Sequence, residues 1–188
     1  MKAVSALFAF VVGCTGYVGE THSPINIELP QLTVADNYRA WPTFLLNVQR
    51  SDSAQVRDIY INDVGATAEQ GAPFPEGTTM VMDLFAAQKD EGGTLLTNDD
   101  GTLLKGDLLK IFVMEKQTGW GQYAESGLQN GDWMYAAYAS DGHTELTDPV
   151  STCFACHLPL GESKDWVQRY DEYFQARMGS ASAGPASP

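Results

Sequence analysis

Two cysteines and one histidine are the residues of this chain whose spacing indicates a definite chemistry. Cys153, Cys156 and His157 form the pattern C-x-x-C-H within the segment STCFACHL. This pattern is typical of covalent c-type haem attachment. Two thiols one helical turn apart can add to the two vinyl groups at one edge of the porphyrin, and the adjacent imidazole can then ligate the iron. The sequence therefore predicts one covalent haem c per chain, with His157 as the metal ligand.

Two other interpretations of this cysteine pair are open. A redox-active C-x-x-C would begin a helix after a strand in a βαβ unit, and a zinc site would need further ligands. The chain shows no βαβ repeat, and the other histidines, His22 and His143, show no ligand spacing. His143 is expected in an exposed loop, with ligation of the iron as the alternative. Because the only other cysteine is Cys14, no disulfide framework exists.

The elements that must position these residues are mainly strands. Short apolar runs rich in β-branched, aromatic and Met residues are separated by Gly-, Pro- and Asn-containing turns. The expected strands span residues 43–49, 56–62, 78–85, 108–115 and 132–139, and the expected helices span residues 34–41, 63–70, 150–157 and 166–177. The pattern predicts an α+β fold, mainly an antiparallel β-sheet with peripheral helices and a C-terminal haem c attachment segment, and not a four-helix bundle.

The N-terminal segment predicts export. Lys2 precedes an uncharged apolar run that ends at Gly13 and Cys14, which is typical of a secretory signal. The run is shorter than the roughly 20 residues that a membrane-spanning helix needs. Residues 11–14, VVGC, resemble a bacterial lipobox, so we expect cleavage after Gly13 and a lipid anchor on Cys14 in the periplasm; plain secretion is the alternative. The predicted organisation is a signal peptide at 1–13, a tether at 14–31, a haem domain at 32–178 and a disordered tail at 179–188.

The charge of the chain excludes one class of partner. The 188 residues include 11 Lys and Arg against 24 Asp and Glu, which gives a formal net charge of −13. A surface this acidic repels phosphate backbones and anionic lipid headgroups. We therefore expect no nucleic-acid binding, and membrane association only through the lipid anchor.

Seven short segments together resemble the cytochrome P-460 family. In chain order they are NYRAW at 37–41, RDIYIN at 57–62, FPEGT at 74–78, VMEK at 113–116, GDW at 131–133, CFACH at 153–157 and DWV at 165–167. The resemblance implies an exported, β-rich, usually dimeric monohaem c-type protein. It also implies one of two activities. One group oxidises hydroxylamine with a haem cross-linked to a lysine, and the other, the cytochromes c′-beta, lacks that link and binds nitric oxide at a five-coordinate iron.

Met82 decides between these two groups. The resemblance places Met82 where the cross-linking lysine would stand, and residues 74–88 contain no lysine. A thioether cannot supply the amine nitrogen of that link. We therefore expect binding of nitric oxide or a related small ligand. The alternatives are a redox enzyme acting on hydroxylamine or another small nitrogen compound, and a six-coordinate electron-transfer cytochrome with a redox partner protein.

Further residues are predicted to lie at the haem. Met80 and Met82 share one face of their strand and are expected to line the haem, with ligation or a thioether link by Met82 as the alternative. Trp133 is expected to contact the haem or the core. By the resemblance, Arg57 and Glu115 are candidate catalytic residues near the haem pocket, the arginine bonding a propionate or a polar ligand and the carboxylate accepting protons. The alternative for both is an ordinary charge on the strand surface.

Overall fold

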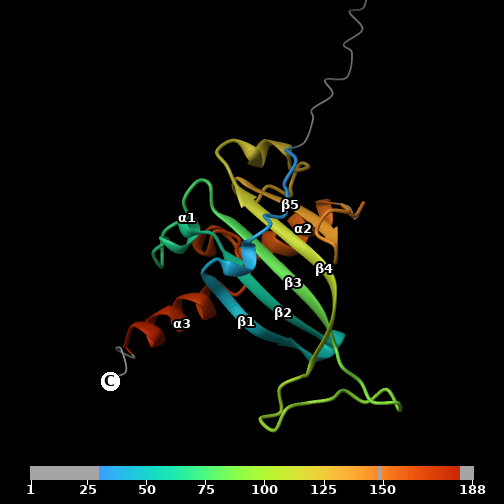
Figure 1. Ribbon diagram of the computed structural model, residues 1–188. Helices are drawn as coiled ribbons and strands as arrows, with labels where there is room; N and C mark the ends of the chain where they lie inside the picture. The colour runs from blue at the N-terminus through green and yellow to red at the C-terminus, as the bar shows by residue number, and fades with distance from the viewer. Residues whose placement is uncertain (1–29, 148–149, 183–188) are drawn as a thin grey trace, which may run out of the picture.

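A computed structural model describes residues 30–147 and 150–182, and these residues form one antiparallel sheet with short helices beside it (Figure 1). The strands follow one another in space as they do in the chain, in the order β1-β2-β3-β4-β5. They are β1 (Thr43–Arg50), β2 (Gln55–Ile61), β3 (Thr79–Ala87), β4 (Lys105–Lys116) and β5 (Trp133–Ala139). The predicted α+β fold with a mainly antiparallel sheet is confirmed.

The helices are α1 (Asp63–Ala66), α2 (Val150–His157) and α3 (Tyr170–Ser182). Only α2 has the length that the sequence predicted. The expected helix at 34–41 is wrong, because only a 3-10 turn, Tyr38–Ala40, forms there. The side chains of Tyr38 and Arg39 in this turn both hydrogen-bond to Asp83 of β3, and the turn does not extend into an α-helix.

The other two expected helices have different bounds from those predicted. α1 ends at Ala66, four residues before the predicted end. α3 begins at Tyr170 instead of residue 166, because Asp165, Trp166 and Arg169 have positive φ angles of 46°, 53° and 60°, which a right-handed helix excludes. It continues to Ser182, four residues into the segment predicted as a tail.

Several predictions fall on parts of the chain that the structure does not describe. The signal peptide, the lipid-anchor site Cys14 and most of the tether lie outside the described residues, as do residues 183–188 of the predicted tail. Within the described ranges, no helix is long and apolar enough to cross a bilayer.

Strand register defines two faces of the sheet. Directly paired residues of antiparallel strands point to the same side. One face, called the α2 face, carries two rows of paired residues: Ile61, Met80, Met114 and Tyr135, and beside them Ile59, Met82, Phe112 and Ala137. The opposite face, called the Tyr38 face, carries Tyr60, Val81, Val113 and Ala136. The expectation that Met80 and Met82 share a face is met.

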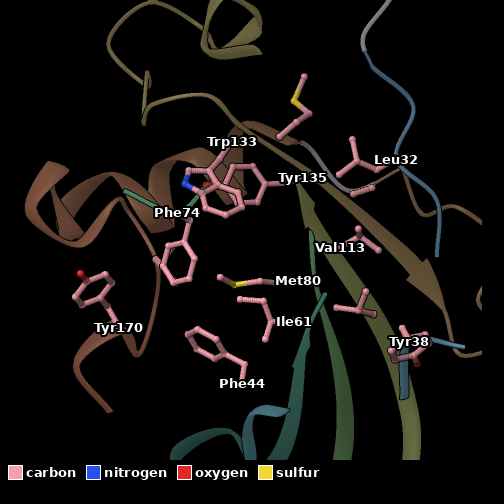
Figure 2. Close-up of a cluster of buried hydrophobic side chains, with 14 of the residues drawn as sticks. Leu32, Tyr38, Phe44, Ile61, Phe74, Met80, Val113, Trp133, Tyr135 and Tyr170 are labelled. Atoms are coloured by element: carbon pink, nitrogen blue, oxygen red, sulfur yellow. The ribbon is translucent and has the colours of Figure 1, made fainter. Parts of the chain in front are cut away.

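An aromatic core covers one end of the α2 face. Phe44 of β1 stacks on Tyr173 of α3 at 4.2 Å between ring centroids, and Phe74 packs edge-on against Trp133 at 6.1 Å. Figure 2 shows Phe44, Phe74 and Met80 gathered on one side of the strands. This cluster packs α3 against the sheet. In the next row of the α2 face, beside Met82, Phe112 faces the cavity that α2 also lines.

Candidate functional site

Helix α2 presents the two cysteines and the histidine together. Phe154 is 3% exposed and meets the Tyr135 ring edge-on at 5.1 Å, which anchors the helix on the α2 face. Cys156 is exposed and Cys153 is half-buried, and the two do not form a disulfide. The two thiols therefore stand one helical turn apart on a helix that is held in place by a different side chain.

His157 is held by a hydrogen bond to a backbone carbonyl. Its Nδ1 lies 2.7 Å from the carbonyl oxygen of Trp166, and its ring lies 4.8 Å from the Tyr135 ring. Because a carbonyl oxygen can only accept, Nδ1 must carry the proton in the neutral ring, and Nε2 keeps its lone pair. Burial lowers the pKa of His157, so the neutral ring is favoured. This is the tautomer and charge state that a metal-ligating histidine requires.

The chain around Trp166 is fixed by contacts from three other segments. The carboxylate of Asp165 accepts two hydrogen bonds from Lys116 Nζ, at 2.8 and 2.6 Å, and one from the backbone N–H of Phe74 at 2.8 Å. The indole Nε1–H of Trp133 donates to the carbonyl oxygen of Asp165 at 2.8 Å. Lys116 is thus paired with a buried aspartate and is not a solvated surface charge. This pairing gives Lys116 a structural role.

A cavity of about 300 Å³ lies beside Cys153, between α2 and the sheet. Its walls are mostly apolar and come from β4, β5, α2 and the segment before α2. They are formed by Phe112, Tyr135, Ala136, Ala137, Glu145, Leu146, Val150, Thr152 and Cys153. The cavity gives Cys153 an apolar space large enough to receive part of a flat, apolar group.

The predicted haem-lining residues occupy different places. Met82 pairs with Phe112, so it lies on the α2 face one strand beyond the cavity wall. Met80 is 3% exposed and packs in the aromatic core, and Trp133 is fully buried there with its indole bonded to Asp165. Of the three, only Met82 is paired directly with a residue that lines the cavity, Phe112, and the haem contacts of all three stay predictions.

The structure separates Arg57 from Glu115. Arg57 pairs with Leu84 on the α2 face, one row beyond Met82, and its Nε is buried without a hydrogen-bond partner among the described residues. Burial, followed by repulsion from neighbouring arginines, lowers its pKa. Glu115 pairs with Thr79 on the opposite, Tyr38 face, and its carboxylate accepts a hydrogen bond from Gln117 at 2.9 Å. Their catalytic roles stay predictions.

Sequence reasoning missed the residues that line the cavity opposite Cys153. Phe112 and Ala137 belong to strands that were expected, but which residues face each other across β4 and β5 depends on register. Glu145 and Leu146 lie between β5 and α2, in a segment without a recognisable motif. The only sequence signal for these lining residues was the alternation of side chains along residues 108–115, and alternation does not show which face of the sheet packs against α2.

These residues fit a haem. A covalently held, anionic porphyrin needs two reduced thiols, an imidazole with Nε2 available, an apolar cavity beside a cysteine and a cationic group, here the Arg57 guanidinium, whose Nε is buried without a partner among the described residues. In the described ranges, no three His, Cys, Asp or Glu side chains gather as a metal-ion site, which the zinc alternative requires. The sheet of the described residues is antiparallel throughout, unlike the βαβ setting of a redox C-x-x-C.

A comparison with known protein families identifies the family of this chain. The family model described as Cytochrome P460 matches residues 35–169, a range that includes all five strands, α2 and the corner behind His157. No curated protein matches the chain. The matched range covers well over half of the sequence, and the chain belongs to the cytochrome P460 family.

Proposed function

We propose that the chain is an exported monohaem c-type cytochrome that binds nitric oxide or a related small neutral ligand. Family membership implies the haem. We assign its thioether bonds to Cys153 and Cys156 and its iron bond to His157 Nε2. The observation that carries this proposal is the hydrogen bond from His157 Nδ1 to the Trp166 carbonyl, next to two cysteines that do not form a disulfide. A bound haem supplies an iron atom that can take up a small ligand and exchange one electron.

The α2 face supports a neutral ligand. Met82, Phe112 and Ala137 form an apolar row beside the cavity. A charged ligand entering such a space would lose hydration without gaining a partner, whereas a neutral diatomic molecule loses little. Arg57, one row away, can offer its unpartnered Nε to a haem propionate or a polar ligand. The row itself offers no second ligand for iron except the Met82 thioether.

One observation favours a second function, oxidation of a small nitrogen compound. β3 contains no lysine, but Lys110 of β4 pairs with Leu84 and Ala139 on the α2 face, one row from Phe112. A lysine that reached the porphyrin from β4 would restore the amine that Met82 lacks. Replacing Lys110 with Met would then remove any lysine-modified haem spectrum, while Lys105→Met would leave it unchanged.

Mass and optical spectra of the protein matured by a c-type haem assembly system test the proposal. We expect one added haem that survives denaturation and is lost in the Cys153→Ala, Cys156→Ala double variant. The ferrous protein should be five-coordinate and should bind nitric oxide stoichiometrically, and Met82→Leu should leave both properties unchanged. A six-coordinate low-spin spectrum that Met82→Leu abolishes would support the electron carrier. A long-wavelength Soret band of modified porphyrin would support the redox enzyme.

We also propose the cellular setting that the sequence indicates. Export to the periplasm and lipidation of Cys14 depend on a segment outside the described residues. Cys14→Ser should convert a membrane-pelleting protein into one that stays in the soluble fraction. An unchanged distribution would remove the lipid anchor and leave export standing. Sedimentation of the haem-loaded protein tests the homodimer that the family resemblance implies, and a redox partner protein remains part of the electron-carrier alternative.

A further inference from the structure

The corner at Asp165 and Trp166 is the part of the molecule that touches His157 without carrying haem chemistry of its own. Both residues have left-handed backbone angles, with φ of 46° and 53°. Non-glycine residues pay a conformational cost there, so surrounding contacts must hold them. The corner exposes one carbonyl, that of Trp166, to His157 Nδ1 at 2.7 Å.

The contact that holds the corner most directly is the ion pair between Lys116 and Asp165. The Lys116 side chain is 13% exposed and the Asp165 side chain 4% exposed, and both carboxylate oxygens accept from Nζ. Lys116 Nζ also lies 5.6 Å from the centre of the Trp133 ring, whose indole donates to the backbone of Asp165. A buried, doubly hydrogen-bonded pair of this kind fixes geometry well, since loss of one partner leaves an unpaired charge.

The backbone orientation of Asp165 helps to set the direction of the Trp166 carbonyl. Asp165 and Trp166 share a peptide bond, and the Trp166 ring packs against Gly131, where an added Cβ would lie 2.7 Å from Cζ3 of the ring. The corner is therefore held by Lys116 and Phe74 on the side chain of Asp165 and by Gly131 under the ring of Trp166. A rotation at Asp165 would turn the Trp166 carbonyl away from His157.

We propose that Lys116 is a positioning residue for the iron ligand: through Asp165 it holds the Trp166 carbonyl against His157 Nδ1 and so increases the electron donation of the imidazole to iron. This inference depends on the proposed role of His157 as the iron ligand. A strong Nδ1–H···O=C bond makes the ring a more basic ligand, which strengthens the iron–nitrogen bond and favours ferric iron. Lys116 thereby influences a metal that it does not touch.

Lys116→Met is the direct test on the haem-loaded protein. We expect the iron–histidine stretching frequency of the ferrous form, measured by resonance Raman, to shift down and the reduction potential to become more positive. Lys116→Arg keeps the charge and should return both values toward those of the wild type. Lys116→Met combined with Asp165→Asn leaves no unpaired buried charge, so it serves if the single variant does not fold, and it should show the same two shifts.

Lys164→Met is the matched control. Lys164 lies two residues before Trp166 and forms an exposed ion pair with Asp171 of α3, and its loss should move neither value. If Lys116→Met and the Lys116→Met, Asp165→Asn double variant, whichever of them folds, keep the wild-type frequency and potential, the positioning role is wrong even though haem binding stands. If the wild type itself shows no iron–histidine band, its ferrous iron is not five-coordinate with a histidine ligand, and the proposed function fails first.

Discussion

Asp83 and Asp165 are two buried aspartates whose surroundings look alike and whose consequences differ. Asp83 is 0% exposed and Asp165 is 3% exposed, and each is paired with one basic side chain. Asp83 accepts from the Tyr38 hydroxyl and from Arg39 Nε and Nη2, the latter two at 2.7 and 2.9 Å. Asp165 accepts from Lys116 and from a backbone N–H. Both satisfy the rule that a buried carboxylate is paired and hydrogen-bonded.

The difference lies in what each aspartate connects. Asp83 is on the Tyr38 face, and its partners come from one segment, which it attaches to the middle of β3. The Arg39 side chain is 51% exposed, so that pair is partly solvated. Asp165 lies in a loop, and the residue after it bonds to His157. A buried, paired aspartate therefore marks a rigid part of the structure. Whether that rigidity affects the candidate site depends on what the residues next to the aspartate contact.

The largest expected effects come from removing the basic partner of each aspartate. We expect Lys116→Met to lower the free energy of unfolding by about 3 kcal/mol, because it leaves a buried carboxylate unpaired. Arg39→Met should cost about 2 kcal/mol, since Asp83 keeps the Tyr38 hydroxyl and the lost pair was half exposed. Denaturant titration gives both values. Only Lys116→Met should alter the iron–histidine band, and an equal change in Arg39→Met would remove the distinction between the two regions.

Gly131→Ala tests the ring side of the corner. Gly131 has a φ of 73°, and the new methyl group would lie 2.7 Å from the Trp166 ring. We expect a loss of about 2 kcal/mol in unfolding free energy together with a shifted iron–histidine band. Gly127→Ala is the control, because Gly127 has a similar φ of 84° and nothing within 4 Å of the added carbon. That variant should lose about 1 kcal/mol and keep the wild-type band.

Tyr138→Phe tests the other attachment of the N-terminal segment to the Tyr38 face. The Tyr138 hydroxyl donates to the carbonyl oxygen of Leu32, and both residues are buried. Loss of one hydrogen bond should lower the unfolding free energy by about 1 kcal/mol. The haem spectra should not change, because this contact lies on the face away from α2. A change in the Soret region of this variant would show that the two faces communicate.

The smallest effect is a pH dependence from Tyr38. Burial, and next its hydrogen bond to Asp83, raise the pKa of Tyr38 above its ordinary value of 10.0. Above pH 10 the unfolded chain loses this proton while the folded chain retains it, so stability falls as pH rises. Unfolding free energies between pH 9 and pH 11 should fall less steeply in Tyr38→Phe. Some slope should remain, since burial also raises the pKa of Tyr135. An equally steep fall would show that Tyr38 does not contribute.

The sequence predicted the strands better than the contacts between them. Short apolar runs rich in β-branched and aromatic residues placed β1 to β5 to within a few residues, because such side chains favour extended, partly buried backbone. The start of α3 was wrong by four residues, since nothing in the types of Asp165 and Trp166 announces a left-handed backbone. The pairing of Met82 with Phe112, and the position of Glu115 on the opposite face, depend on register, which long-range packing decides.

The strand order bears on how the molecule is assembled. Each strand pairs with its neighbours in the chain, so the sheet can form by adding one strand at a time in chain order. The cysteines and His157 follow all five strands along the sequence. A chain that grows from its N-terminus can therefore complete the sheet before the segment with Cys153, Cys156 and His157 has been synthesised. Under the proposed haem attachment, the haem would be joined to a segment that packs on a sheet already formed. Slow attachment would then delay the packing of α2 on the sheet but not the formation of the sheet.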